Sequence, residues 1–451
     1  MTFIDRFREA LRIPTAWPEG AAPGDTRAEA PLRAFQAFLA ERYPAFHKAA
    51  RRRVLSPYSV LYRWPGSGGA GALPALLLGH YDVVPAEAPK WTRDPFGAEL
   101  REEDGAAWVY GRGALDMKSM VAALLEAAEE KCRAGFVPQR DIWFAFGGDE
   151  ERTGALGARN AAAYFAEEGI RFEWILDEGG PVAEDQVKGV SKAPALVGIE
   201  EKGFLSVRLS VRQGAGHASA PPDVQAVAVL ARALLRVGKR PFPWRLVPTA
   251  RAFFAGLGAH TTGARGFVMR HAALAGPLFF KAVSAAPSIA ALLRTTTAMT
   301  QLSASPADNV MPSEAAAVLN LRLLPPWTVA SALERLRAVI ADDRVTLSVH
   351  GLASDPVPAA PGQERMQGPA WDCIRGAIGA AFPDAPVIPF LMTATTDSRH
   401  YHALARQIFR FNPQRLNPGE LARMHGHDER ISVANLERGL TFYRTLLESG
   451  I

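Results

Sequence analysis

Residues 72–82, ALPALLLGHYD, combine the two features that decide the fold. An uninterrupted apolar run over 72–78 is bounded by Gly and is followed at once by His80 and Asp82. Such a run is typical of a strand that is buried on both faces of a sheet. Residues 141–146 (DIWFAF) and 172–176 (FEWIL) have the same character, and each is also followed by acidic residues. We therefore expect buried strands that end in polar side chains.

Helical patterns separate these strands. Residues 119–135 predict one helix, closed by Gly135 and Pro138, and residues 155–168 predict another. Alternation of strand and helix favours a mostly parallel central sheet with helices on its faces. The same texture returns beyond residue 356, with a helix over 371–381, a strand over 387–391 and a final helix over 433–447. The prediction is an α/β catalytic domain formed by residues 1–197 and 357–451.

The intervening residues 198–356 have a different pattern. Residues 203–212, 315–323 and 345–350 alternate like half-exposed antiparallel strands, while 224–237 and 329–341 are helical in period. We expect an inserted α+β lid and dimerisation domain. Within it, residues 241–300 are rich in Phe and Ala and predict an extra helical insertion. Four of its Phe residues either line an apolar acyl channel or pack in a core or dimer interface: Phe253, Phe254, Phe279 and Phe280.

Composition excludes several classes of protein. The chain has 451 residues, of which 48% are hydrophobic, so it is neither disordered nor collagenous. It is also too long for a single core, which usually stops growing at about 250–300 residues. Only Cys132 and Cys373 carry thiols, so any metal must be held by His and carboxylates. The net charge of +5 comes from scattered arginines with one short run at 51–53, which does not indicate nucleic-acid binding.

No targeting or membrane-spanning segment is recognisable. The N-terminal sequence MTFIDRFREALRIPT has helical spacing without an uninterrupted apolar stretch, so we expect a cytoplasmic protein. The best membrane candidate, residues 272–293, is broken by Pro277, Lys281 and Pro287 and falls short of a span. Contact of the insertion with a membrane surface remains an alternative.

Acidic and His residues follow each predicted strand and recur in two other loops. They are His80 and Asp82, Asp116 in GALDMK, Asp149 to Glu151, Asp177 and Glu178, and the segment HGHDE that begins at His425. Strand ends of an open α/β sheet meet at one edge, so these groups should share a cleft. So many acids resist joint ionisation unless cations neutralise them. His and carboxylate without thiolate suit zinc, cobalt or manganese, and a bridging carboxylate is typical of two-metal hydrolytic centres.

The motifs that carry these residues resemble a known family. GHYDVVP, GRGALDMKSM, GGDEERTG, ILDEGG, GHASAPP, TTDSRH and MHGHDERIS are similar, in order and over nearly the full length, to signatures of the two-zinc amidohydrolase and exopeptidase superfamily. That superfamily includes aminoacylase, acetylornithine deacetylase, succinyl-diaminopimelate desuccinylase and the glutamate-releasing carboxypeptidase. The long lid, ILDEGG and GHASAPP most resemble the Gly-Xaa carboxypeptidase and N-fatty-acyl-amino-acid hydrolase branch.

The resemblance implies two Zn²⁺ ions per subunit, for which Co²⁺ or Mn²⁺ are possible substitutes. It implies that His80 and Asp177 bind one ion, that Glu151 and His425 bind the other, and that Asp116 bridges both. Glu150 would be the general base, and Asp82 would orient the imidazole of His80. Glu178 and His427 are expected to be neighbours of the site rather than ligands. The family also has a cis peptide after the bridging Asp, here Asp116-Met117.

Further residues are implied outside the metal segments. In dimeric relatives the residue that matches His217 reaches the partner's active site and stabilises the oxyanion, so we expect a homodimer formed through the lid. Asn309, Arg322 and Arg399 are the candidates for binding the substrate. A guanidinium group can bind both oxygens of a free α-carboxylate, which Lys cannot imitate.

The resulting prediction is a zinc-dependent hydrolase that cleaves an amide bond next to an amino acid with a free carboxylate. Its substrate would be an N-acyl amino acid or a short peptide. The alternatives are a dipeptidase, an N-deacylase of a small metabolite, an inactive scaffold, and a protein that binds a membrane surface. The sequence does not specify the acyl chain or the amino acid.

Overall fold

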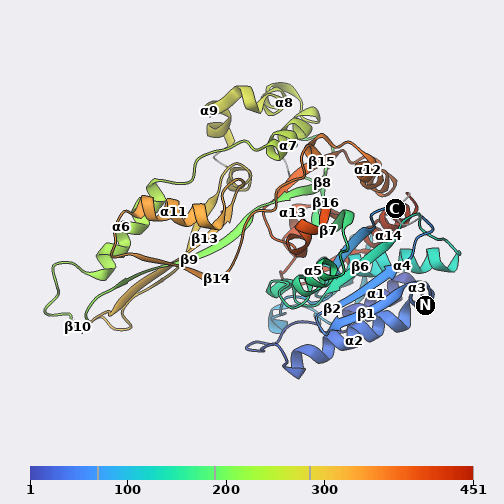
Figure 1. Ribbon diagram of the computed structural model, residues 1–451, viewed down its shortest axis with the longest axis horizontal. Coiled ribbons are helices and arrows are strands. Elements are labelled where there is room, and N and C mark those ends of the chain that lie inside the picture. The colour runs from blue at the N-terminus through green and yellow to red at the C-terminus, as the bar shows by residue number, and fades with distance from the viewer. Residues whose placement is uncertain (69–70, 187–188, 284–285, 450–451) are drawn as a thin grey trace.

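The structure of the protein, a computed structural model, describes residues 1–68, 71–186, 189–283 and 286–449. A mixed eight-stranded sheet forms its centre (Figure 1). In order across the sheet, the strands are β1 (Arg51–Ser56), β2 (Ser59–Trp64), β6 (Ile142–Gly147), β3 (Ala75–His80), β7 (Phe172–Ala183), β16 (Ala405–Leu416), β8 (Ala195–Glu201) and β15 (Val387–Met392). β3 runs parallel to β6 and β7, and β16 runs parallel to β7. The mostly parallel centre is the one that the sequence predicts.

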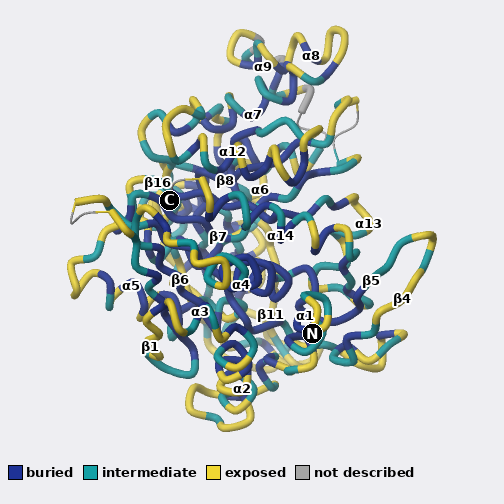
Figure 2. The backbone as a smooth tube through the Cα atoms, turned by 90° about the vertical axis from the view of Figure 1, so that its right-hand side faces the viewer, coloured by how far each residue is buried: buried dark blue, intermediate teal, exposed yellow. Residues whose placement is uncertain are grey.

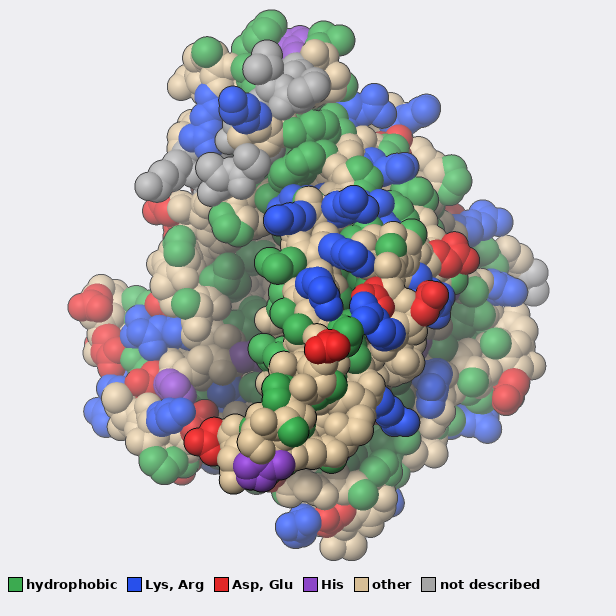
Figure 3. Space-filling model, turned by 90° about the vertical axis from the view of Figure 1, so that its left-hand side faces the viewer, with side chains coloured by type: hydrophobic (Ala, Val, Ile, Leu, Met, Phe, Trp, Pro, Cys, Tyr) green, Lys and Arg blue, Asp and Glu red, His purple; other side chains and the backbone are tan. Residues whose placement is uncertain are grey.

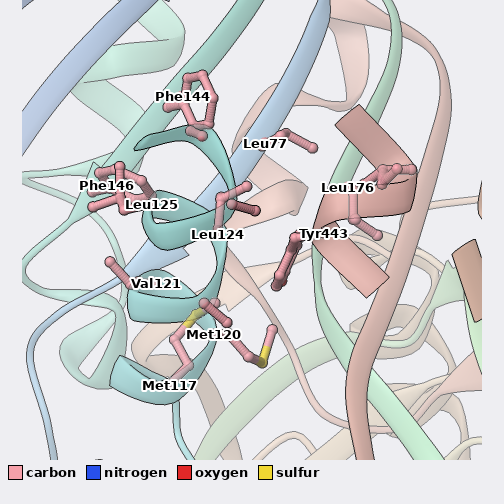
Figure 4. Packing of buried hydrophobic residues seen from close by; sticks show 14 of the residues in the cluster. Leu77, Met117, Met120, Val121, Leu124, Leu125, Phe144, Phe146, Leu176 and Tyr443 are labelled. Carbon is pink, nitrogen blue, oxygen red and sulfur yellow. The ribbon is translucent and has the colours of Figure 1, made fainter. Parts of the chain in front are cut away.

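Helices cover both faces of this sheet, and the burial of the sheet between them is visible in Figure 2. One face is packed by α2 (Thr26–Arg42), α3 (Pro44–Ala49), α4 (Lys118–Arg133), α12 (Pro369–Ala381) and α14 (Val433–Glu448). The opposite face is packed by α5 (Ala158–Glu167) and the 3₁₀ segment η4 (Asp397–Leu404). Figure 4 shows Val121, Leu124 and Leu125 of α4 lying against the aromatic and leucine side chains of the central strands. This packing fixes the turn before α4, which carries Asp116.

Short elements border the catalytic domain. α1 (Phe3–Leu11) packs beside a three-stranded sheet made of β4 (Leu100–Glu103), β5 (Ala106–Tyr110) and β17 (Arg430–Ser432). The remaining short helices are η1 (Ala88–Lys90), η2 (Glu150–Arg152), η3 (Gln363–Arg365) and α13 (Pro418–Leu421).

The lid is a separate antiparallel sheet with its own core. Its strands, in order, are β11 (Thr296–Ser303), β13 (Glu314–Leu323), β9 (Gly203–Arg212) and β14 (Thr346–Ser354). α6 (Ala226–Lys239) and α11 (Val329–Ile340) bury one face of this sheet through residues such as Leu230, Leu319 and Leu336. At the far tip, β10 (Gly216–His217) pairs with β12 (Val310–Met311) (Figure 1).

The chain enters and leaves the lid at one place. β8 stays in the central sheet as far as Glu201, so the lid strands begin at Gly203, slightly later than the predicted boundary of 198. Glu201 pairs with Val357 where the chain returns. The lid is therefore an insertion attached through two adjacent segments, with its return close to the expected residue 357.

The helical insertion belongs to the core next to the central sheet. It contains α7 (Pro248–Ala259), α8 (Gly263–Arg270), α9 (Ala272–Val283) and α10 (Pro287–Ala291), while positions 284–285 lie outside the described residues. Phe253, Phe254 and Phe279 are buried against Ile388 and Leu391 of β15, and Phe280 packs against the same cluster. The core interpretation therefore holds in place of the acyl channel. Among the described residues, no helix has the length and apolar character needed to cross a bilayer.

Candidate metal centre

The predicted polar side chains meet at one edge of the central sheet. His80 is the last residue of β3, Glu150 and Glu151 begin the short helix η2 after β6, and Glu178 lies in β7. Asp116 comes from the turn before α4, and its peptide bond to Met117 is cis, as the resemblance implies. His425 comes from the loop after α13. Five segments that are distant in sequence thus supply one cleft.

Asp116 lies between two imidazole groups. Its Oδ1 is 2.9 Å from Nε2 of His80, and its Oδ2 is 3.1 Å from Nε2 of His425. The Nε2 atom of His425 is also 3.1 Å from Oε1 of Glu151. Each oxygen of Asp116 therefore faces a different His, which is the placement that a bridging carboxylate needs.

The ligand atoms are close enough to hold metal ions. One group consists of His80, Asp116 and Glu151, and a second consists of His80, Glu150 and Glu178, with the atoms of each group within 4.8 Å of one another. Oε1 of Glu151 is buried, and although Nε2 of His425 lies 3.1 Å from it, it accepts no hydrogen bond of suitable geometry from the described residues. A buried carboxylate oxygen without a donor is costly, and a cation would satisfy it. The donor set fits a divalent cation.

Glu178, not Asp177, lies beside His80. Oε1 of Glu178 is 3.5 Å from Nε2 of His80. The two oxygens of Asp177 instead accept hydrogen bonds from the backbone N–H groups of Glu178 (2.9 Å) and Ser398 (2.8 Å). Because consecutive side chains of a strand point to opposite faces, only one of the pair can face the cleft. In the structure Glu178, rather than the expected Asp177, faces the cleft, because the apolar run before the pair does not reveal which of the two side chains turns toward it.

Asp82 supports two parts of the site at once. Its carboxylate oxygens accept the backbone N–H groups of Glu150 and Glu151, each at 3.1 Å. Nδ1 of His80 lies 3.0 Å from the main-chain oxygen of Asp82 and 3.4 Å from its Oδ1. Asp82 therefore contacts the imidazole of His80 and also holds the loop that presents Glu150.

Glu429 is a buried support that the sequence reading missed. It accepts hydrogen bonds from Arg112 (2.7 Å) and from the backbone N–H of Leu115 (2.7 Å), in the turn that presents Asp116. Arg112 also donates to the main-chain oxygen of His425 (3.3 Å). An acid within the motif HGHDE was the available signal, but the sequence could not separate a support from a ligand.

Burial and mutual repulsion keep protons on this cleft when no cation is present. Burial, together with the negative charge of nearby carboxylates, raises the pKa of Glu150 and of Glu178 well above the ordinary value for Glu. The adjacent carboxylates of Asp116 and Glu151 raise the pKa of His425 to about 10. Cations in the cleft would replace these protons as the neutralising charge.

The metal cleft extends into a cavity of about 940 Å³ that also contains arginines. Arg322 lies over the ring of Phe204 at 4.9 Å, and burial lowers the pKa of its guanidinium. Arg399 donates to the main-chain oxygens of Thr153 (2.5 Å) and Thr396 (3.2 Å). Both line the same cavity as Asp116 and Glu150. The cleft thus has one carboxylate-rich region and one cationic region.

Three predicted residues lie away from this cleft. His217 and Asn309 are exposed at the tip of the lid, where the N–H of Ala218 donates to the main-chain oxygen of Asn309 at 3.0 Å. Neither lines the metal cleft of its own subunit. His427 is exposed and belongs to neither group of candidate ligands. His425 also lies outside those groups, but its Nε2 is 3.1 Å from Oδ2 of Asp116, so it is the His that faces Asp116.

A family profile and several relatives in the known sequences indicate the same family. The profile of peptidase family M20/M25/M40 matches residues 76–449. The probable carboxypeptidase S-like 2 of Dictyostelium discoideum is 37% identical over 418 residues, covering 92% of this chain and 79% of that protein. The N-fatty-acyl-amino acid synthase/hydrolase of Mus musculus is 32% identical over 447 residues, covering 97% and 86%.

Solved structures share the fold at low sequence identity. An M20 family metallo-carboxypeptidase from Sulfolobus solfataricus superposes with a TM-score of 0.72 at 16% identity, covering 99% of both chains. Human carnosine dipeptidase 1 superposes with a TM-score of 0.65 at 16% identity, covering 99% of this chain and 95% of that one. The fold of this chain, over nearly its full length, is therefore shared with both of these solved structures.

Proposed function

Because the chain belongs to peptidase family M20/M25/M40, we propose that it cleaves the amide bond joining an acyl group or amino acid to an amino acid with a free α-carboxylate. That it is a hydrolase of amide or peptide bonds follows from the family and from its carboxypeptidase and N-acyl amino acid hydrolase relatives. The class of substrate is inferred from the residues of the cleft. An inactive scaffold is disfavoured, since the cleft keeps the general-base residue Glu150 beside the candidate ligands.

The proposed substrate class is supported by the separation of the cleft into a carboxylate-rich region and a cationic region. Carboxylates and His gather in one region, while Arg322 and Arg399 line the same cavity. A guanidinium binds a planar carboxylate through two parallel hydrogen bonds, and it remains charged when partly buried. A substrate with a scissile carbonyl near the metal ligands and a free carboxylate near the arginines matches both regions.

The metal site proposed here holds two Zn²⁺ ions. His80 and Glu178 would bind one ion, Glu151 and His425 the other, and Asp116 both. When bound, such ions polarise the scissile carbonyl and acidify the attacking water. Three protein ligands for each ion leave a position open, as catalytic zinc requires.

Glu150 moves the proton in the proposed mechanism. Its carboxylate oxygen lies within 4.8 Å of the ligand atoms of His80 and Glu178, and Asp82 holds its backbone N–H. Glu150 would take a proton from the attacking water and deliver it to the leaving amine nitrogen. A carboxylate held beside the candidate ligands is placed to serve both halves of this transfer.

The lid would complete the site in a homodimer. His217 and Asn309 are polar, exposed and distant from the cleft of their own subunit, so a partner's cleft is their proposed place of action. His217 would donate a hydrogen bond to the oxyanion that develops on the scissile carbonyl.

A substrate screen tests the proposal. N-acyl amino acids with independently varied acyl chain and amino acid are compared with dipeptides and with the matching N-acyl amino acid amides, which lack the free carboxylate. We expect turnover of the free acids, and kcat/KM lower by about 10²-fold for the amides, because a partly buried guanidinium would lose its partner. Equal turnover of acids and amides would refute the carboxylate requirement.

A variant of Arg399 tests whether this residue binds the free carboxylate of the substrate. Arg399→Met should reduce kcat/KM for the free acids while leaving the slow reaction of the amides nearly unchanged. Equal losses for both substrates would show that Arg399 only supports the fold. A preference for dipeptides over all N-acyl amino acids would make the protein a dipeptidase instead.

A further inference from the structure

The lid contains a second cavity that shares no lining residue with the metal cleft. It has a volume of about 360 Å³ and lies between α6, α11, α10 and the start of β11. Much of its wall is apolar, with Val237, Phe242, Ala290, Met299 and Leu336 among the lining residues. Nothing in the proposed reaction uses this space.

The charged groups of this cavity are all cationic. Arg240, Arg294 and Arg335 line it, and no Asp or Glu is among the described lining residues. This continues a feature of the sequence, because residues 224–307 contain no Asp or Glu. Their Lys and Arg residues are Arg232, Arg236, Lys239, Arg240, Arg245, Arg251, Arg265, Arg270, Lys281 and Arg294. In Figure 3, Lys and Arg side chains are spread over the upper part of the lid end among hydrophobic and neutral ones.

Two of the three guanidinium groups have donors to spare. Among the described residues, the side chains of Arg240 and Arg294 form no hydrogen bond or ion pair, and Arg294 lies over the ring of Trp244 at 4.5 Å. Arg335 donates to the main-chain oxygen of Pro241 (2.9 Å), while its Nε is buried without an acceptor in the described part of the chain. The cavity therefore combines an apolar wall with unneutralised positive charge.

From this combination we infer that the lid cavity binds an aliphatic carboxylate of medium chain length. A carboxylate would accept hydrogen bonds from Arg240 and Arg294, which suit its planar geometry. An alkyl chain would fill the apolar part, where the hydroxyl groups of a sugar or nucleoside would lack partners. Ligand cavities span about 300–1,000 Å³, so this small one accommodates a single compact chain.

The ligand class has a simple chemical relation to the proposed function. Hydrolysis of an N-acyl amino acid releases an aliphatic carboxylate, so the enzyme would meet this ligand as a product. The inference does not require that activity, because the cavity and its charges exist independently of the metal cleft. Binding is measured directly and can fail while turnover succeeds, or the reverse.

The test is calorimetric titration of the full-length protein with octanoate, decanoate and dodecanoate. Gly238→Leu is the first variant, since a Cβ at Gly238 would meet only Met299 Cε, at 3.8 Å, and the longer side chain would occupy the cavity. Arg240→Ala/Arg294→Ala is the second. Arg232→Ala/Arg251→Ala is the control, because it removes two cations from the same acid-free segment at positions that do not line the cavity.

We expect the wild type to bind one alkyl carboxylate per chain and Gly238→Leu to bind none. Arg240→Ala/Arg294→Ala should bind it at least about tenfold more weakly, and the control should bind it as the wild type does. Dodecanol and acetate, which keep only one half of the ligand, should bind poorly. Turnover of the preferred substrate should stay near the wild-type value in all variants. Equal binding by the wild type and Gly238→Leu would overturn the inference, as would equal losses in the control.

Discussion

Asp177 and Glu178 are adjacent acids with different tasks, and their positions give a direct test of the metal site. Glu178 faces His80, whereas Asp177 accepts two backbone N–H groups. Glu178→Ala should lower the bound metal from two ions to about one per chain, because one ion keeps too few ligands. Metal analysis of the purified protein measures this.

Asp177→Asn is the matched variant for that experiment. It keeps the size of the side chain and at least one acceptor, so both ions should remain bound. Retention of two ions by Glu178→Ala together with loss of one by Asp177→Asn would restore the original sequence assignment.

Glu150 is the residue whose removal should separate catalysis from metal binding. Glu150→Ala should reduce kcat by about 10²–10⁴-fold, because general acid–base transfer contributes about that much. The metal content should stay at two ions per chain. If the variant loses an ion instead, Glu150 is a ligand and the proton must be transferred by another group.

Lys202 gives a prediction on pH because it is buried where the central sheet meets the lid. Its ammonium group donates to the main-chain oxygens of Ala291 and Arg294 (both 2.9 Å). Burial, together with the charges of Arg322 and Arg294, lowers its pKa from 10.5 to about 7. The unfolded chain therefore binds more protons than the folded one between these values, so this residue makes the folded state more stable as pH rises.

Comparison with Lys202→Met isolates that contribution. Above pH 7, the free energy of unfolding of the wild type should rise relative to that of the variant by up to about 1.4 kcal/mol per pH unit. Urea denaturation at pH 7, 8 and 9 measures the shift. A difference that is flat with pH would mean that Lys202 stays charged in the folded protein.

At the scale of elements, the strands that could be predicted are those marked by a short apolar run in the central sheet or by alternation of apolar and polar residues in the lid. β3, β6 and β15 follow directly from short apolar runs, because burial on both faces excludes polar residues. β16 was not predicted, since Arg410, Asn412 and Gln414 interrupt its pattern. Each is nevertheless buried and has a partner: Arg410 contacts Glu201, Asn412 accepts the N–H of Gly179, and Gln414 donates to Leu115. Partners distant in sequence make such a strand possible.

The insertion helices show the opposite case, in which the elements were expected but their place was open. Phe254 is fully buried between α7 and the edge of the central sheet and contacts the ring of Phe279. Phe254→Ala should lower the free energy of unfolding by about 3–5 kcal/mol, the usual cost of such a cavity. The ranking of substrates by acyl-chain length should not change.

Two measurements check this interpretation. Chemical denaturation gives the loss of stability, and the acyl-chain series gives the specificity at a temperature where the variant is folded. A shift toward longer or bulkier acyl chains without loss of stability would return Phe254 to the substrate channel.

At the scale of the whole molecule, the candidate site was predictable where its motifs are compact. His80, Asp116, Glu150 and Glu151 lie together as expected from the resemblance. Glu429 and Arg112 were not predictable, because their role depends on a hydrogen bond between segments more than three hundred residues apart. The proposed place of His217 depends on a second subunit, and an assembly of subunits is not written in any one segment of the sequence.

Complementation between inactive subunits tests whether His217 acts in the cleft of a partner subunit. Glu150→Ala and His217→Ala disable different parts of the proposed site, one in the catalytic domain and one at the tip of the lid. If His217 acts across a dimer, a mixed dimer contains one site with both residues intact and one with neither. Random pairing makes about half of all dimers mixed, so about a quarter of wild-type activity should return.

Glu150→Ala mixed with Glu151→Ala provides the matched control. Both lesions lie in the catalytic domain, so every site in a mixed dimer is defective and activity should stay at the background level. The subunits are coexpressed to allow exchange, and activity is measured per total chain. Absence of recovery with His217→Ala, in mixed dimers verified by differently tagged chains, would place His217 outside the partner's site. Recovery near a quarter requires that the lid of one chain completes the cleft of the other, because no single chain in the mixture carries both residues.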